Sequence, residues 1–149
     1  MEEENKNKIE VDAIDNVYKN AHIALQSISD VLKITDDENF KRELNDEYDG
    51  YEHAIGKISA YMKEKGVEPR DINPIKKAMM WTSINMNAMT DKSTSHLADM
   101  MLKGTIMGIS ELMQLLSRDE GSLSEETREM TKMLIDLEEG YEKNLKNFL

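Results

Sequence analysis

The chain has 149 residues, of which 39% are hydrophobic and 33% are charged, a composition that suits one globular domain. Its 30 acidic and 19 basic residues give a formal net charge of −11, which argues against nucleic acid as a partner, and no apolar run approaches the roughly 20 residues of a membrane span. The absence of cysteine excludes disulfides, thiolate metal sites and cysteine nucleophiles, and it fits a cytoplasmic location.

The first segment, residues 1–9, is polar and acidic, and we expect a disordered tail there rather than a signal peptide. Apolar residues then recur at spacings of three and four, which predicts a first helix over 10–34. The inward stripe of this helix is Val11, Ile14, Tyr18, Ala21, Leu25, Ile28 and Leu32.

A second helix is predicted over 38–65. Thr35 and Glu38 have the spacing of a capping box, in which the threonine oxygen accepts a free backbone N–H and the glutamate reaches back. Gly66 stands where a glycine commonly ends a helix. The inward stripe contains one carboxylate and comprises Phe40, Leu44, Glu47, Tyr51, Ile55, Ile58 and Met62.

Residues 66–93 form a connector that is expected to contain a short helix of its own. Asn73 precedes Pro74 as a cap precedes the favoured first-turn proline, which predicts a helix over 74–89. Residues 90–95 are rich in Ser, Thr and Asp, which favour caps and turns, so we expect a break there.

Two more helices are predicted, over 94–118 and 123–148, the second opened by a capping box from Ser122 to Glu125. No segment alternates with period two, so we expect no sheet. The inward residues are Leu97, Met101, Gly104, Gly108, Leu112 and Leu115 on the third helix, and Met130, Leu134, Leu137, Tyr141, Leu145 and Phe148 on the fourth.

The two halves of the chain resemble each other. Residues 46–53 match 136–143, and residues 27–32 match 108–113, in the same order. This repeat predicts a single domain over 10–149, made of two αα-hairpins, 10–65 and 94–149. Because the connector 66–93 is long enough to run the length of a bundle, the second and third helices can lie parallel. We therefore predict an all-α, up-down-down-up four-helix bundle with an additional crossover helix.

This arrangement resembles the ferritin-like, rubrerythrin-like four-helix proteins over residues 10–149. The run Asp-x-Ser-x-Ser-His at 91–96, followed by Ala98 to Met101 and by Gly104-x-x-x-Gly108, is similar to a ferritin-like group of anaerobic Gram-positive bacteria that brings no activity with it. The wider family implies a di-iron site built from a glutamate on each of two helices and Glu-x-x-His on each of the other two.

The ligand set that the resemblance implies is incomplete. Glu47 and Glu138 are predicted to lie at one level of the bundle, but Gly50 and Tyr141 stand three residues after them, where histidine is required. The other two helices offer Leu25 and Gly104 at that level, and no Glu-x-x-His occurs in the chain. We therefore expect no cofactor and no metal.

Four residues remain as candidates for an atypical iron or manganese site. They are Glu47, Glu138, Tyr51 and Tyr141. The alternative interpretation gives Glu47 no metal: it lies on the buried stripe, and a tyrosine, Tyr18 or Tyr141, is expected to donate a hydrogen bond to it.

The mid-helix glycines before the two tyrosines, Gly50 and Gly140, indicate close approach of a ring or helix to bare backbone, or space for a ligand. Eight of the 12 methionines lie between Met79 and Met113, which favours core filling or an adaptable contact surface, and we expect a homodimer through this segment.

Three functions are compatible with these features. The first is a non-catalytic ferritin-like helical protein that acts through protein–protein interaction or as a structural component. The second is a metal-binding oxidoreductase or iron-handling protein that uses the carboxylate and tyrosine residues. The third is small-molecule binding in the bundle interior.

Histidines His22, His53 and His96 have no partners at metal-ligand spacing, and no nucleophilic triad or phosphate loop is present, so an enzyme is not favoured.

Overall fold

The computed structural model describes residues 2–68, 90–118 and 121–149, and this part of the chain is helical without strands. Its elements are α1 (Glu2–Leu32), α2 (Glu38–Glu64), α4 (Thr94–Arg118) and α5 (Glu125–Leu145), followed by the 3₁₀ turn η1 (Lys146–Phe148). The all-helical prediction is confirmed for these residues. The predicted connector helix over 74–89 lies outside them.

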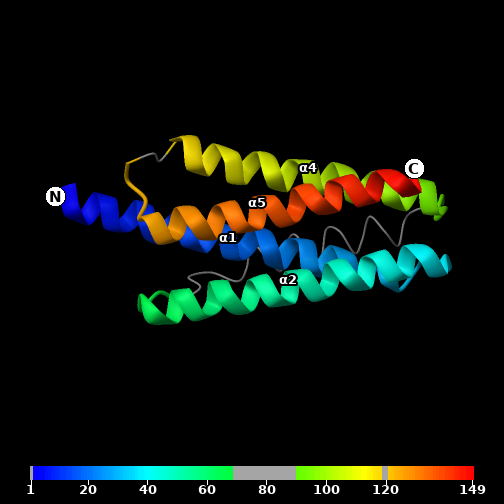
Figure 1. The fold of residues 1–149 in the computed structure, drawn as a ribbon, viewed down its shortest axis with the longest axis horizontal. Coiled ribbons are helices and arrows are strands. Elements are labelled where there is room, and N and C mark those ends of the chain that lie inside the picture. Colours follow the sequence, from blue (N-terminus) through cyan, green and yellow to red (C-terminus); the bar gives the residue numbers. More distant parts are fainter. Residues whose placement is uncertain (1, 69–89, 119–120) are drawn as a thin grey trace.

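The described helices form two antiparallel hairpins that pack side by side (Figure 1). α1 packs against α2, α4 packs against α5, and further contacts join α1 to α4 and α2 to α5. The starts of α2 and α4 lie at the same end, where the Thr94 hydroxyl donates a hydrogen bond of 3.3 Å to the Asp37 carboxylate. α2 and α4 therefore run parallel, as the length of the connector predicted.

The start of α2 differs from the predicted capping box. The cap is Asp37, whose Oδ1 accepts the backbone N–H of Phe40 at 2.9 Å. Thr35 instead accepts the N–H of Asp37 at 3.4 Å, in the turn before the helix. A carboxylate at this position also interacts favourably with the positive end of the helix dipole, which gives Asp37 an advantage over a hydroxyl.

The other helix ends follow the predicted residues closely. Gly66 ends α2 in the left-handed region, with φ 67°, and the N–H of Val67 donates back to Met62 at 2.8 Å. Ser124, inside the predicted box, caps α5 by accepting the N–H of Thr127 at 3.1 Å. α5 therefore begins at Glu125, two residues later than predicted.

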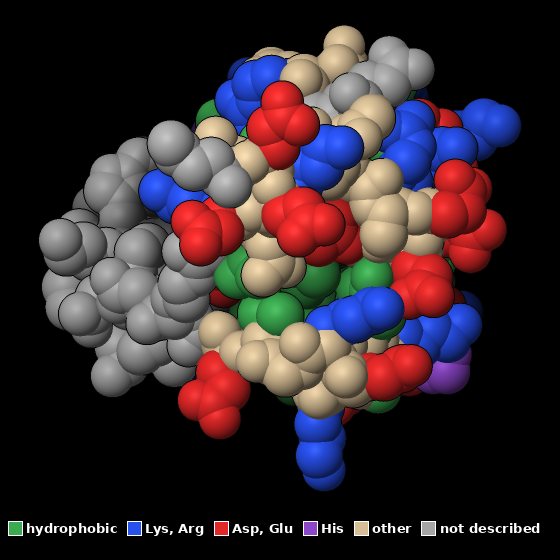
Figure 2. Space-filling model, turned by 90° about the vertical axis from the view of Figure 1, so that its left-hand side faces the viewer, with side chains coloured by type: hydrophobic (Ala, Val, Ile, Leu, Met, Phe, Trp, Pro, Cys, Tyr) green, Lys and Arg blue, Asp and Glu red, His purple; other side chains and the backbone are tan. Residues whose placement is uncertain are grey.

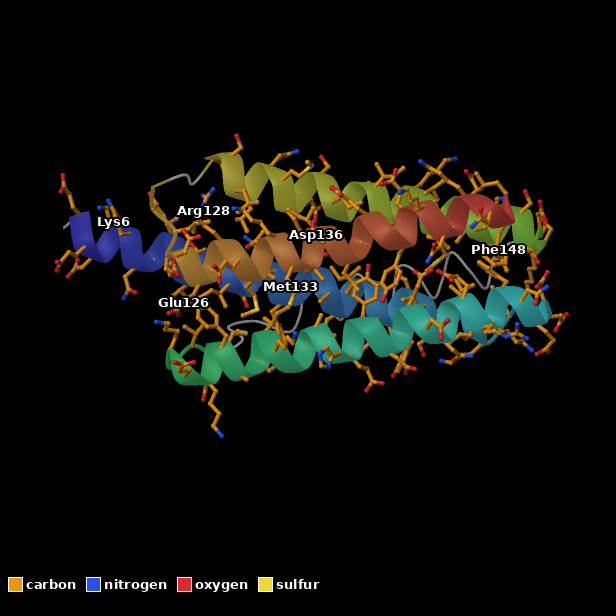
Figure 3. The ribbon with its side chains drawn as sticks, viewed as in Figure 1. Lys6, Glu126, Arg128, Met133, Asp136 and Phe148 are labelled. Carbon is orange, nitrogen blue, oxygen red and sulfur yellow. The ribbon has the colours of Figure 1, made fainter. Side chains whose placement is uncertain are left out.

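α1 begins at Glu2, so the segment 2–9 that we expected to be a disordered tail forms its first two turns. These turns extend past the ends of the other helices, and Lys6, labelled in Figure 3, lies on this extension. The first turn holds three glutamates, which interact favourably with the helix dipole, and no glycine or proline interrupts the segment.

The core lies along the centre of the bundle, and in the end view of Figure 2 hydrophobic side chains are visible at the centre, surrounded by charged side chains of both signs. One predicted inward residue is wrong: Gly104 is exposed, because α4 turns Met101, Leu102 and Ile109 toward its neighbours instead. At the C-terminal end the rings of Phe40 and Phe148 lie 5.2 Å apart (Figure 3). The largest fully buried apolar side chains are Tyr51, Phe40, Ile28, Leu44, Ile58, Leu97, Leu112, Leu134, Leu145 and Val17.

Candidate functional site

Two glutamates are buried in the middle of the bundle. Glu47 on α2 and Glu138 on α5 are each 1% exposed, which confirms the expected burial of Glu47. Glu47 follows Leu44 by three residues on the inward stripe, so the same helical periodicity that builds the core also buries this carboxyl group. A buried carboxyl group has to be neutral or compensated, since burial of a bare charge is costly.

Burial favours the neutral form of both carboxyl groups. It raises the pKa of Glu47 to about 9, and the neighbouring Glu43 raises it further through a side-chain hydrogen bond and like charge. Burial also raises the pKa of Glu138 to about 8, where a hydrogen bond from Tyr51 acts in the opposite direction and the charge of Glu111 adds to the rise. Burial therefore favours the protonated form of both groups at neutral pH.

Two tyrosines lie against these carboxyl groups. The rings of Tyr51 on α2 and Tyr141 on α5 have centroids 5.3 Å apart. Burial, followed by the negative charges of Glu138 and Glu47, raises the pKa of Tyr51 well above its usual value. Burial and the charge of Glu47 raise the pKa of Tyr141 to about 12. Both phenols therefore remain hydrogen-bond donors at neutral pH.

The expected tyrosine bond to Glu47 is wrong. Tyr51 donates to Glu138, whereas Glu47 has its side-chain hydrogen bond with Glu43, one helical turn earlier on α2. Tyr18 lies elsewhere, because it lines a hollow with Met62 and Val67 at the end of α2, and its ring packs on His22 with a centroid separation of 4.4 Å.

Two glycines bring the helices close together at this level. A Cβ on Gly50 would overlap the Tyr141 hydroxyl, so the predicted approach of a ring to bare backbone is confirmed there. A Cβ on Gly108 of α4 would lie 2.7 Å from Oε1 of Glu138. Asn20 on α1 donates to the carbonyl oxygen of Gly108 at 3.1 Å. Asn20 and Gly108 therefore lie at the level of Glu138. Helix lengths had predicted Leu25 and Gly104 at this level, which are five and four residues away along their helices.

Several oxygens of the cluster have no hydrogen-bond partner in the described part of the chain. These are Oε1 of Glu43, Oε2 of Glu47 and Oε1 of Glu138. Oxygens of this kind are ligands that iron and manganese accept. However, the described residues contain no group of three or more His, Asp or Glu side chains placed to hold a metal ion.

The histidines do not complete a metal site. His22 is half-buried against Tyr18, and burial lowers its pKa. His53 is exposed, as predicted, and the backbone N–H of His96 donates to the Ser93 hydroxyl at 3.3 Å in the cap of α4. The residues present therefore do not fit the di-iron ligand set that the ferritin-like resemblance implies.

Sequence reasoning missed Glu43 and Asn20 as members of the cluster. Glu43 precedes Glu47 by four residues, which places both on one helical face, so this spacing was a usable signal. Asn20 gave no signal, because its role depends on the approach of α1 to the backbone of α4.

A second polar cluster joins three helices at the end where α5 begins. The carboxylate of Glu10 on α1 accepts the backbone N–H of Ser124 at 2.8 Å and its hydroxyl at 2.6 Å, and it also accepts the Thr127 hydroxyl. The Tyr61 hydroxyl on α2 lies 3.0 Å from that of Thr127. Since these contacts hold the Ser124 cap of α5 in place and join it to α1 and α2, this cluster is structural.

Comparison with protein-family models, curated proteins and solved structures gave no match to the chain. Within the described residues, none of the helices combines the length and the apolar character that crossing a membrane requires.

Two hollows outlined by described residues lie away from the cluster, one of about 360 Å³ beside Met62 and Val67 and one of about 530 Å³ between Lys19 and Arg118.

Proposed function

We propose that this is a non-catalytic helical protein with a ferritin-like arrangement, crossover helix included, that has lost the di-iron ligand set. Its role is protein–protein interaction or structural support in the cytoplasm. The proposal includes a homodimer through the methionine-rich segment between Met79 and Met113, whose described part carries the exposed Met107.

The observation that carries the proposal is the way the centre of the bundle is filled. The Tyr141 hydroxyl packs against Gly50, and the Glu138 carboxyl group packs against Gly108. Side chains therefore take up the space that a ligand beside the two tyrosines would need. Burial also favours the neutral form of both carboxyl groups, so a divalent cation would have to displace their protons on binding.

The second candidate is an atypical iron or manganese site on Glu47 and Glu138, beside Tyr51 and Tyr141. The unpartnered oxygens of Glu47 and Glu138 favour it, because a bound cation would satisfy both and would keep the carboxylates ionised. Glu43 lies one turn before Glu47 on α2, but the described residues do not bring three carboxyl groups together around one cation, so this candidate rests on Glu47 and Glu138.

One experiment separates the two candidates. Thermal melts of the wild-type protein and of Glu47→Gln are recorded with and without Fe(II) or Mn(II), together with metal analysis of the purified protein. Substoichiometric metal and an unchanged melting temperature support the interaction role. A metal-dependent rise in the wild-type melting temperature that is absent in Glu47→Gln overturns it in favour of the metal site.

A further inference from the structure

The outer face of α4 carries an apolar side chain that is mostly exposed. Met107 is 65% exposed, the largest exposure among the large hydrophobic residues of the described chain. Isolated exposed apolar residues are common on protein surfaces. Ile106 and Met113 on α4 are also exposed, at 45% and 52%, but they lie 100° and 120° around the helix from Met107, so Met107 is the apolar residue at the centre of its own face.

A glycine lies beside Met107, and no side chain of the described residues packs against it. Gly104, one helical turn before Met107, is exposed, and a Cβ there would meet no atom within 4 Å. A mid-helix glycine costs about 1 kcal/mol relative to alanine. At Gly50 and Gly108 that cost allows a neighbouring side chain to approach, whereas Gly104, like Gly56 and Gly140, has no such neighbour among the described residues and leaves open surface beside Met107.

The charges around Met107 are symmetrically placed and opposite in sign. Lys103 precedes it by four residues and Glu111 follows it by four, and both are exposed. At 100° per residue these three residues share one face of the helix. Gly104 and Ser110, each three residues from Met107, place small side chains at equivalent positions on the two edges of that face.

This pattern is complementary to itself. We infer that the face of α4 centred on Met107 binds the same face of a second copy, with the two α4 helices antiparallel about a twofold axis through Met107. Residues equally far before and after Met107 then face each other across the axis. Lys103 of each copy meets Glu111 of the other, Gly104 meets Ser110, and the two Met107 side chains are in contact.

The geometry favours a second copy over an unrelated partner, because a twofold axis needs equal and opposite groups at equal distances on one surface. Lys103 is available for this contact. Its bond of 2.8 Å to Asp99 is an exposed pair between side chains that are 73% and 41% accessible, and such pairs contribute little. This inference deepens the proposed interaction role and rests on it.

Sedimentation velocity over about 10 µM to 1 mM protein tests the inference, since a contact between single helices gives a modest affinity. The wild-type protein should form dimers, and Met107→Glu should weaken the dimer by more than about thirtyfold. Met113→Glu is the matched control. Met113 is similarly exposed but lies 120° around α4 from Met107, so its substitution should leave the dimer unchanged.

A charge exchange tests the register of the two helices. Lys103→Glu or Glu111→Lys alone should weaken the dimer by about tenfold, because each creates two like-charge contacts across the axis. The double variant should return to within about threefold of the wild type. A double variant no better than the single variants overturns the inference.

Two other outcomes overturn the inference, and they are distinguishable from failure of the proposed function. A wild-type protein that is monomeric throughout excludes this dimer and with it the homodimer of the proposed function, but leaves interaction with other proteins untouched. A dimer unaffected by Met107→Glu excludes this face and leaves the interaction role intact. The proposed function itself fails on a different measurement, the metal-dependent melting temperature. Far-ultraviolet circular dichroism of each variant confirms that the helices are retained.

Discussion

The hydroxyl group of Tyr141 on α5 occupies the space that a side chain on Gly50 of α2 would fill. A Cβ on Gly50 would overlap that oxygen and would lie 3.5 Å from Cδ1 of Leu137. Gly140 stands at the matching position of the repeated segment, yet it is exposed and a Cβ there would meet nothing within 4 Å. Two glycines that match in sequence therefore differ in what surrounds them, and the same substitution should have opposite effects at the two positions.

Replacing Gly50 with alanine should lower the free energy of unfolding by about 1–3 kcal/mol, the cost of overpacking a core. The clash outweighs the gain in helix propensity of about 1 kcal/mol, because the Tyr141 ring packs on Tyr51 and has little freedom to move away. Gly140→Ala, the matched control, should raise the free energy of unfolding by up to about 1 kcal/mol. Urea unfolding measures both changes.

A double-mutant cycle assigns the Gly50 effect to the tyrosine oxygen. Tyr141→Phe removes the atom that a Cβ on Gly50 would overlap. In this background Gly50→Ala should cost at least about 1 kcal/mol less than in the wild type. An equal cost in both backgrounds would show that the hydroxyl group is not the obstacle.

Stability should fall as the pH rises from about 5 to 9. The pKa values of Glu47 and Glu138 are raised from 4.5 to about 9 and about 8, so the folded protein keeps protons that the unfolded chain releases above pH 4.5. The stabilisation is complete below pH 4.5 and is lost as the pH approaches the folded pKa values. The slope for each group is at most about 1.4 kcal/mol per pH unit. Urea unfolding at a series of pH values measures it.

Glu47→Gln isolates the contribution of one carboxyl group to this slope. Glutamine resembles the neutral acid, so at pH 7 the variant should lose at most about 1–2 kcal/mol, the scale of one hydrogen bond. Its free energy of unfolding should depend less steeply on pH than that of the wild type. Parallel curves for the two proteins between pH 5 and 9 would mean that Glu47 is ionised in the folded state.

Glu10 should contribute more to stability than the whole N-terminal extension before it. Glu10→Ala removes the acceptor of the Ser124 N–H and of two hydroxyl groups, and should cost about 1–3 kcal/mol. Deleting residues 2–8 removes exposed helical turns and should cost less than about 1 kcal/mol. Thermal melts compare the two. A larger loss from the deletion would show that the extension packs on the bundle.

Helix positions followed from the sequence because local signals set them. The three-and-four spacing gave α2 and α4 to within one residue, and Gly66 acts as the predicted terminator. The start of α2 was predicted correctly, but its cap was misassigned to Thr35, because Asp37 and Thr35 are both capable caps and spacing alone cannot rank them. The start of α1 was missed because a polar segment has no hydrophobic period, although acidic first-turn residues were present.

The candidate site was predicted only in part, because its details depend on packing between helices. Burial of Glu47 followed from periodicity within one helix. The hydrogen-bond partner of each carboxyl group did not follow from periodicity. Tyr51 on α2 reaches Glu138 on α5, and Glu47 interacts with Glu43 on its own helix. The sequence repeat suggested equal environments for Gly50 and Gly140, but a repeat in sequence does not require equal neighbours in space.

The hydrogen bond between Tyr51 and Glu138 should set the titration of that glutamate. The bond lowers the pKa of Glu138, in opposition to burial, because the phenol donates better to the carboxylate than to the neutral acid. Tyr51→Phe removes the donor and keeps the ring against Tyr141. The pKa of Glu138 should therefore rise above about 8 in the variant, and the pH at which its stabilisation disappears should rise with it.

Carbon-13 NMR titration of the Glu138 carboxyl group measures this shift directly. Tyr141→Phe is the control, because its hydroxyl group packs against Gly50 and contributes nothing to the pKa of Glu138. Glu138 should therefore titrate as in the wild type in that variant. At pH 7 Tyr51→Phe should also lower the free energy of unfolding by about 1–2 kcal/mol, the scale of one hydrogen bond to a charged or strongly polar group. A Glu138 pKa that stays constant or falls in Tyr51→Phe would show that the phenol does not donate to this carboxyl group, and burial would then be the main determinant of its titration.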